Sequence, residues 1–136
     1  MIRPIMQDVL FLSQSSVKAT AKDRNVAKDL LDTLQANKDC CVGMAANMIG
    51  VNKRIIAFNN GKANIIMYNP VIISKTGPYD TEEGCLSLTG ERATTRYQEI
   101  VVAYQDDKMS MHKEKFSGFV AQIIQHECDH LEGIII

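Results

Sequence analysis

Apolar positions along this chain recur at helical spacing in two stretches, one in each half. The first predicts a helix over residues 21–37, because Thr20 can cap its start and Asn37 interrupts its apolar stripe. The second predicts a helix over residues 118–132, between a serine cap and a glycine stop. The apolar positions of the two stripes are Val26, Leu30, Leu31 and Leu34, and then Phe119, Val120, Ile123 and Ile124.

The pattern between these two helices is that of short strands. The expected strands cover residues 54–58, 64–68, 71–74, 100–104 and 109–116. Asn60 and Gly61 separate the first two runs, and Asn-Gly between apolar runs is the strongest short-range signal for a hairpin. A helix, several strands in hairpins and a final helix predict an α+β fold with a mainly antiparallel sheet around the C-terminal helix.

Two stretches of the chain follow neither period. Residues 1–19 contain Pro4 and several serines, and we expect them to form an extended arm that wraps the body. Residues 40–50 are small and flanked by glycine, which suits close packing or a backbone that approaches a ligand, and composition leaves that choice open. With 136 residues and no visible linker or repeat, residues 1–136 are expected to form a single domain.

Composition narrows the classes of partner. The chain is 46% hydrophobic and 23% charged, with a formal net charge of -1, so it offers no basic footprint for nucleic acid. The apolar run Val9–Leu12 is too short for a signal-peptide core or a membrane span. We therefore expect a cytoplasmic protein without a membrane partner. The cysteines at positions 40, 41, 85 and 128 lack the density of a disulfide scaffold, and reduced thiols are expected.

The second predicted helix carries the pattern His-Glu-x-x-His. Its two histidines, His126 and His130, are four residues apart and therefore share one face of the helix. Such a pair can hold one metal ion. Catalytic sites of the zinc type use three protein ligands and leave one position for water, so a third ligand must come from elsewhere in the chain.

Several side chains could supply that third ligand. Cys128 is set aside because it lies about 200° around the helix from His126, and it is expected to pack in the core. Cys85 is favoured by its local chemistry, because Gly84 lets the backbone turn and present the thiolate together with the amide that follows it. The other candidates are the carboxylates, Cys40 and Cys41, which are expected to be small packing residues, and His112, which is expected at the surface.

Two motifs make the chain resemble the peptide deformylases, metal hydrolases that remove the formyl group from the N-terminal methionine of newly made bacterial proteins. Residues 83–87 are Glu-Gly-Cys-Leu-Ser, as in the family, and residues 125–133 match its Gln-His-Glu-x-Asp-His-Leu-x-Gly. The order of the motifs and the spacing between them also agree, and the resemblance covers the whole chain. It implies the family's fold and an activity on formyl-methionyl nascent peptides at the ribosome.

Carried over residue by residue, the resemblance implies a division of roles at one metal site. The ligands of a single divalent ion would be Cys85, His126 and His130. The ion would be ferrous iron in cells, and zinc, nickel or cobalt could take its place. Glu127 would act as general base or acid beside the ion, and the backbone amide of Leu86 would donate to the oxygen that becomes negative.

The family's first motif, Gly-x-Gly-Leu-Ala-Ala-x-Gln-x-Gly, corresponds to residues 41–50, where two departures stand out. Cys41 replaces a glycine, and Met48 replaces a glutamine whose side-chain amide, in the family, also donates to that oxygen. A thioether has no proton to donate, so we expect a genuine but weakened activity. The implied substrate-binding positions are Gly43, Met48 and Arg92, although an arginine is more often a surface residue.

Other interpretations of the same residues compete with this one. A metalloprotease of the thermolysin type takes its third ligand from a downstream helix, for which the short tail after His130 leaves no room. A structural zinc site would need a fourth protein ligand, and none is visible. A binding or regulatory relative that keeps the metal but no longer deformylates stays open because of Met48. Glu83 and Asp129 adjoin ligands, so each could be a solvated charge or a hydrogen-bond partner of a ligand.

Overall fold

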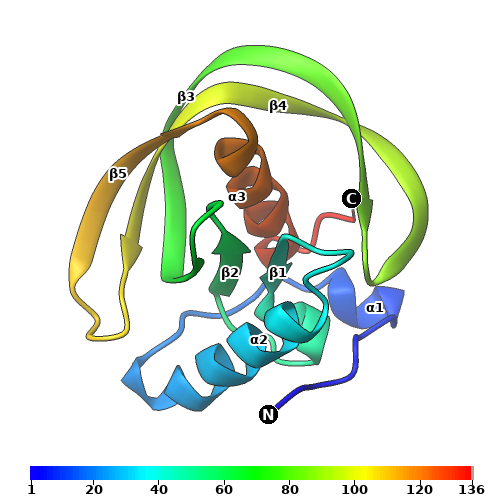
Figure 1. Ribbon diagram of the computed structural model, residues 1–136, viewed down its shortest axis with the longest axis vertical. Helices are drawn as coiled ribbons and strands as arrows, with labels where there is room; N and C mark the ends of the chain where they lie inside the picture. The colour runs from blue at the N-terminus through cyan, green and yellow to red at the C-terminus, as the bar shows by residue number, and fades with distance from the viewer. Residues whose placement is uncertain (136) are drawn as a thin grey trace.

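The structure is a computed structural model that describes residues 1–135 and, at Leu88, the backbone alone. The order of its helices and strands confirms the predicted α+β class, with an antiparallel sheet and a helix near the carboxyl end (Figure 1). The elements are α1 (Val9–Leu12), the 3-10 turn η1 (Ala21–Asp23), α2 (Arg24–Ala36), β1 (Gly43–Ala45), the 3-10 turn η2 (Ala46–Ile49), β2 (Ile55–Asn59), β3 (Asn64–Cys85), β4 (Leu88–Gln105), β5 (Met111–Ser117) and α3 (Gly118–Leu131).

Both predicted helices are confirmed. The helix expected over residues 21–37 begins as η1 and continues as α2. Its capping box is present, since the Thr20 amide donates to Asp23 Oδ2 at 2.8 Å while Thr20 Oγ1 accepts from the Lys22 amide at 3.2 Å. The helix expected over residues 118–132 is α3, and it follows the predicted serine directly. Apolar spacing thus predicted both helices, with a capping box at the start of the first, whereas Ser117 makes no side-chain cap hydrogen bond at the start of α3.

The strands form one sheet in the order β1-β2-β3-β4-β5, so each strand pairs with the next along the chain. The predicted strands 71–74 and 100–104 are too short, because β3 and β4 continue as one long hairpin from Tyr68–Gln105 to Cys85–Leu88. Most side chains in the missed part of β3 are exposed, so it lacks an alternating apolar pattern and is held by backbone pairing. This hairpin arches around α3 (Figure 1).

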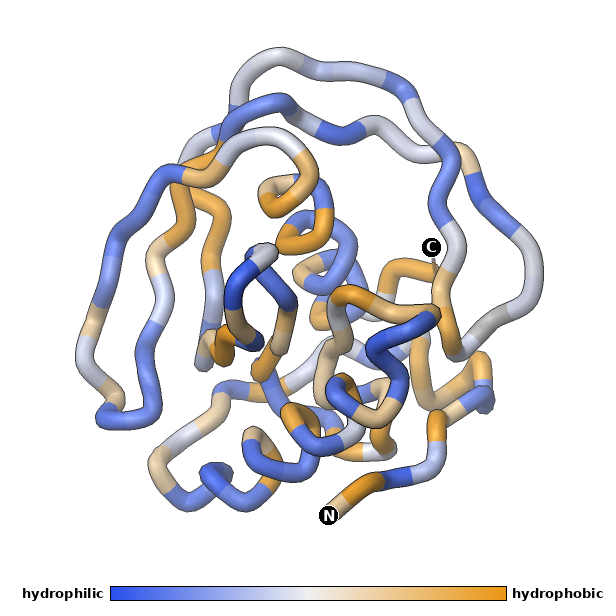
Figure 2. Tube along the Cα trace, viewed as in Figure 1, coloured by the Kyte–Doolittle hydropathy of each residue, from blue (hydrophilic) through white to orange (hydrophobic). Residues whose placement is uncertain are grey.

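Strand β2 separates two apolar cores. Ile55 and Ala57 belong to the cluster that packs with α2, whereas Ile56 and Phe58 belong to the cluster that packs with α3. All four side chains are buried, because successive residues of a strand point to opposite faces and here both faces are covered. Hydrophobic residues gather in this central part, and the outer arch of β3 and β4 is more hydrophilic (Figure 2). Apolar packing therefore supports β1 and β2 from both faces.

The amino-terminal arm lies against the body, as expected, and also contains the single turn α1. The Met6 amide donates to the Met48 carbonyl at 2.7 Å, and the Ser16 amide donates to the Leu131 carbonyl at 2.7 Å. The arm thus contacts both η2 and the end of α3. Nowhere in residues 1–135 does a helix combine the length and the apolar character that crossing a membrane requires.

Candidate metal centre and pocket

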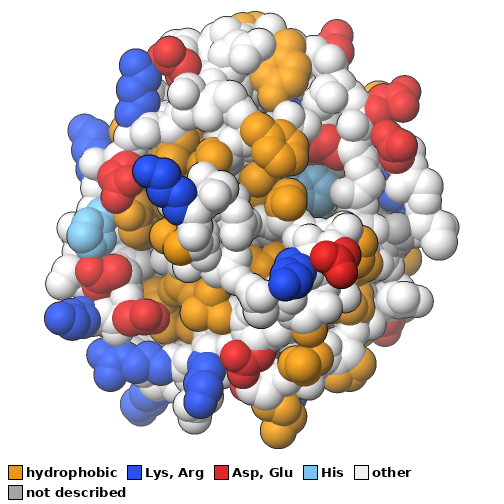
Figure 3. Space-filling view, viewed as in Figure 1, with side chains coloured by type: hydrophobic (Ala, Val, Ile, Leu, Met, Phe, Trp, Pro, Cys, Tyr) orange, Lys and Arg blue, Asp and Glu red, His pale blue; other side chains and the backbone are white. Residues whose placement is uncertain are grey.

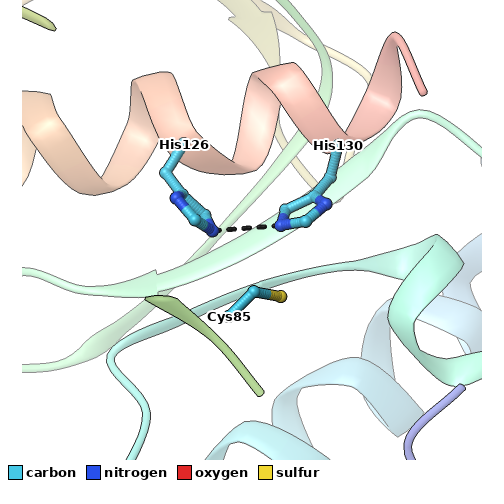
Figure 4. Close-up of side chains that lie close together, drawn as sticks. All are labelled: Cys85, His126 and His130. Atoms are coloured by element: carbon cyan, nitrogen blue, oxygen red, sulfur yellow. Dashed lines mark hydrogen bonds between the residues drawn. The ribbon is translucent and has the colours of Figure 1, made fainter. Parts of the chain in front are cut away.

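Helix α3 presents both histidines of the His-Glu-x-x-His pattern on one side. Their Nε2 atoms lie 3.0 Å apart, and both side chains are buried. Cys85, the last residue of β3, lies opposite the two rings (Figure 4). One ligand atom from each of Cys85, His126 and His130 lies within 4.8 Å of the others. The structure therefore brings together the three side chains that the sequence named as ligands.

This donor set fits a divalent transition-metal ion. Two imidazole nitrogens and a cysteine sulfur are ligands that zinc and ferrous iron both accept. Metal–nitrogen bonds of about 2.0–2.1 Å in tetrahedral geometry place two nitrogens about 3.4 Å apart. The observed 3.0 Å between the Nε2 atoms needs only a small adjustment to reach that value. Three protein ligands would leave a fourth position for water or substrate, as catalytic sites require.

The two histidines have opposite pKa shifts. Burial lowers the pKa of His126, but hydrogen bonds with Cys85 and Glu83 outweigh burial and raise it to about 10. Burial and the charge of His126 lower the pKa of His130 to about 3. One proton is shared between the Nε2 atoms of the two rings. Once that shared proton leaves, both Nε2 atoms are free to bind a metal ion.

Glu83 holds His126 from behind the site. Its Oε1 lies 2.7 Å from His126 Nδ1, and Arg96 donates to both carboxylate oxygens at 2.7 to 3.1 Å. Burial raises the pKa of Glu83, but its hydrogen bonds outweigh burial and lower the pKa to about 2. A carboxylate on the far nitrogen of a ligand fixes the orientation of the ring. Hydrogen bonding to a ligand is thus confirmed for Glu83, whereas Asp129 accepts from Arg96 at 2.7 Å.

Glu127 is buried between His126 and strand β1. A Cβ atom at Gly43 would lie 2.6 Å from Ile123 Cγ2 and 2.9 Å from Glu127 Oε2, so only glycine lets β1 approach α3 this closely. Burial raises the pKa of Glu127 to about 7. Its Oε1 has no hydrogen-bond partner among the residues that the structure describes. Glu127 can therefore exchange a proton near neutral pH with a group that enters beside it.

A pocket of about 260 Å³ opens next to these residues, between β1, the end of β3 and α3. Figure 3 shows hydrophobic side chains gathered beside a histidine near the middle of this face. The lining residues are Cys40, Cys41, Val42, Gly43, Met48, Glu82, Glu83, Gly84, Cys85, Leu86, Phe119, Gln122, Ile123, His126 and Glu127. Apolar walls next to acid–base groups suit a small peptide end rather than a highly charged ligand.

The structure also places the residues implied as substrate contacts. Gly43, Met48 and Leu86 line the pocket, and Leu86 follows directly after the last residue of β3. Met48 is buried, and its sulfur accepts from the Ala45 amide at 3.5 Å, so the side chain offers no donor. Arg92 is half-buried on β4 and is absent from the lining of the pocket, so its contact with substrate stays a prediction.

Sequence reasoning missed two pocket residues on α3, Phe119 and Gln122. Both precede His126 at helical spacing and lie on the same face of the helix, so counting back from the first histidine could have identified them. Residues 40–50, whose role composition left open, form β1 and η2 and supply one side of the pocket.

The remaining cysteines and His112 occupy different environments. Cys128 packs against the core beside α3, and His112 is exposed, as the sequence predicted for each. Cys41 packs against the other core and also lines the pocket, where burial raises the pKa of its thiol to about 12. Cys40 is exposed at the pocket, so the expectation that it packs is wrong. An exposed, solvated stretch after α2 explains that difference, because it leaves the thiol no core to enter.

Comparison with known sequences identifies the family to which the chain is similar. The family model described as "Polypeptide deformylase" matches residues 1–136. A peptide deformylase from Clostridium beijerinckii is 57% identical over 136 residues, which cover 100% of both chains. A peptide deformylase from Dictyoglomus turgidum is 35% identical over 137 residues, with 99% of this chain and 88% of the relative covered.

Solved structures give the same result for the fold. A peptide deformylase from Legionella pneumophila superposes with a TM-score of 0.89 at 29% identity, covering 99% of this chain and 83% of that one. The Met-Ala-Ser-bound class I type b peptide deformylase from Acinetobacter baumannii superposes with a TM-score of 0.90 at 26% identity, covering 99% and 97%. The sheet, the long hairpin and the histidine-bearing helix are therefore an arrangement shared with these proteins.

Proposed function

This chain belongs to the polypeptide deformylase family, and we propose that Cys85, His126 and His130 hold the metal ion on which its activity depends. The protein is a metal-dependent hydrolase that removes the N-formyl group from the formyl-methionine of nascent peptides. The convergence of a thiol and two imidazoles within 4.8 Å, beside a pocket that also contains Glu127, carries the residue assignment. When bound, the ion polarises the formyl carbonyl and acidifies a water molecule.

Glu127 is the proton carrier in this proposal. Its carboxylate accepts a proton from the attacking water and then delivers a proton to the amine that leaves. Burial supports that cycle, because it raises the pKa of the side chain to about 7, where the charged and neutral forms are nearly equal in energy. The unpartnered Oε1 is the atom that would hold the proton.

Backbone groups around Glu127 would bind and orient the substrate. The Leu86 amide, directly after Cys85, would donate to the formyl oxygen as negative charge develops on it. Gly43 lines the pocket, and its backbone would contact an extended peptide bound there. The Met-Ala-Ser peptide bound to the Acinetobacter baumannii relative supports a substrate that begins with methionine.

Metal identity and cellular setting complete the proposal. Nitrogen and thiolate ligands accept ferrous iron, zinc, nickel and cobalt, and we propose ferrous iron as the ion used in cells. The activity of the family on formylated nascent peptides supports a cytoplasmic site of action, on chains that emerge from the ribosome.

Metal content and turnover together test these roles. The wild-type protein should carry one metal ion per chain and release formate from formyl-Met-Ala-Ser under anaerobic conditions. Cys85→Ser should lose both metal and activity. Cys40→Ser, which replaces an exposed thiol, should keep its metal. Glu127→Ala should keep the metal and lose about 10²–10⁴ in turnover. A Cys85→Ser protein with full metal content, or a Glu127→Ala protein with undiminished turnover, would refute the corresponding role.

A further inference from the structure

Gln122 occupies a position that the reaction described above does not use. It lies on α3 four residues before His126, and its side chain lines the same pocket. Tyr79 donates to its Oε1 at 3.3 Å, and its Nε2 donates to Glu83 Oε2 at 2.8 Å. Glu83 is ion-paired to Arg96 and accepts only, so the NH₂ group must be the end that faces it. The orientation of the amide is therefore fixed from both ends.

The fixed amide has one hydrogen left over. An amide NH₂ carries two hydrogens, and Glu83 takes one of them. No other residue in the described part of the chain accepts the second. Gln122 is the one side-chain amide among the described residues that line the pocket, whose walls include the apolar side chains of Val42, Phe119 and Ile123. A side-chain amide donor held by Tyr79 and Glu83 is thus placed in the pocket beside these apolar side chains.

We propose that Gln122 determines specificity by donating this hydrogen to an acceptor atom near the end of the substrate's first side chain. The inference rests on the proposed function, in which the formyl group lies beside His126 and Glu127. Gln122 lies about 6 Å along the helix from His126, at a rise of 1.5 Å per residue. A side chain as long as methionine, attached one atom from the formamide nitrogen, extends over such a distance. Its thioether sulfur is a weak acceptor, and the donor faces it without needing to reorganise.

The contribution of Gln122 to kcat/KM should then depend on how strongly the substrate atom opposite its amide accepts a hydrogen bond. Norleucine has methionine's length but a methylene in place of sulfur, so it offers the amide no hydrogen-bond acceptor. Methionine offers a weak acceptor, and methionine sulfoxide offers a strong one in nearly the same place. The loss caused by removing the amide should therefore increase from norleucine to methionine to methionine sulfoxide.

The experiment measures kcat/KM for formyl peptides that begin with these three residues and continue with Ala-Ser. Gln122→Leu keeps most of the side-chain volume but removes the donor, and Gln98→Leu makes the same change at an exposed site on β4 outside the pocket. Gln122→Leu should lower kcat/KM about two- to fivefold more for the methionine peptide than for the norleucine peptide. For the sulfoxide peptide the extra loss should be about tenfold. Gln98→Leu should leave all three values unchanged. Tyr79→Phe, which frees one end of the amide, should give smaller losses in the same order.

The ratios of kcat/KM between substrates distinguish a role of Gln122 in specificity from a role in supporting the metal site through Glu83. Gln122→Leu also removes a hydrogen bond to Glu83, and that effect alone would lower all three values by the same factor together with the metal content. Equal losses on the three peptides would overturn the inference and leave Gln122 a support for Glu83. A wild-type protein that hydrolyses none of the three would overturn the proposed function and this inference with it.

Discussion

At the scale of single residues, Met48 is where this site departs most from a full set of oxyanion donors. Its sulfur accepts from the Ala45 amide, and nothing in the side chain can donate. The neighbouring Asn47 does not replace the missing donor, because its side chain is buried outside the pocket lining, where its Nδ2 donates to the His130 carbonyl at 2.9 Å. The Leu86 amide is then the remaining protein donor that we assign to the formyl oxygen.

Restoring a side-chain amide at this position should raise activity. Removal of one oxyanion-hole donor typically costs about 10²–10³ in turnover, so Met48→Gln should increase kcat on formyl-Met-Ala-Ser by at least about tenfold. Met48 is not a ligand, so metal content should stay the same. Met48→Leu, which changes the shape but adds no donor, serves as the control. Equal turnover by wild type and Met48→Gln would mean that a water or another group already supplies the donor.

At the scale of secondary-structure elements, the site depends on how closely β1 lies against α3. Gly43 makes this approach possible, since any Cβ atom there would meet Ile123 and Glu127. The apolar stripe of α3 holds the helix in place from the other side, through Ile124 and its neighbours in the core. The two elements form the wall that positions Glu127, so a small displacement of either one would move the proposed proton carrier.

Gly43→Ala should therefore destabilise the protein and slow the reaction together. Overpacking of this kind costs about 1–3 kcal/mol, measurable as a lower midpoint of urea unfolding, and turnover should fall because Glu127 is displaced. The Cβ atom would lie 2.6 Å from Ile123 Cγ2, so Ile123→Ala in the same chain should relieve part of the crowding. The double variant should then be more stable than the sum of the two single effects predicts. Strict additivity would show that the two side chains do not collide.

Some of these elements could be predicted from the sequence, and others could not. Helix α3 was predictable because its stripe, cap and metal pattern all lie within one short segment. The outer part of β3 was missed because residues such as Lys75 and Asp80 are exposed and carry no apolar alternation. Strand β1 is too short for any period to mark it. The distance between Cys85 and α3 depends on the curvature of the long hairpin, which no local pattern encodes.

At the scale of the whole molecule, the candidate ligands come from two distant parts of the chain. Cys85 ends β3, while His126 and His130 lie on the last helix of the described residues. A metal ion held by all three would cross-link the sheet to that helix, in addition to the apolar contacts already present between them. Metal binding should therefore stabilise the folded state as a whole and not the site alone.

Removal of the metal should lower the temperature of unfolding. A ligand present at about 100 times its Kd contributes about 2.7 kcal/mol, which corresponds to a shift in Tm of about 5–10 °C for a chain of this size. Scanning calorimetry of the metal-loaded protein with and without a chelator measures the shift. Cys85→Ser should show a low Tm that the chelator does not change. An equal Tm for the loaded and chelated wild type would show that the ion does not join the sheet to the helix.

The position of Cys85 at the turn of the β3–β4 hairpin also has a consequence for the order of folding. Pairing of two long antiparallel strands starts most cheaply at their connection, where the loop to be closed is shortest. The Cys85–Leu88 end should therefore form first, and pairing should extend outward toward Tyr68 and Gln105. The thiol is then in place early. Both histidines reach the site only when α3 docks, and that docking requires contacts between residues far apart in the sequence. Docking of the last helix, rather than formation of the sheet, becomes the event that completes a site able to capture metal.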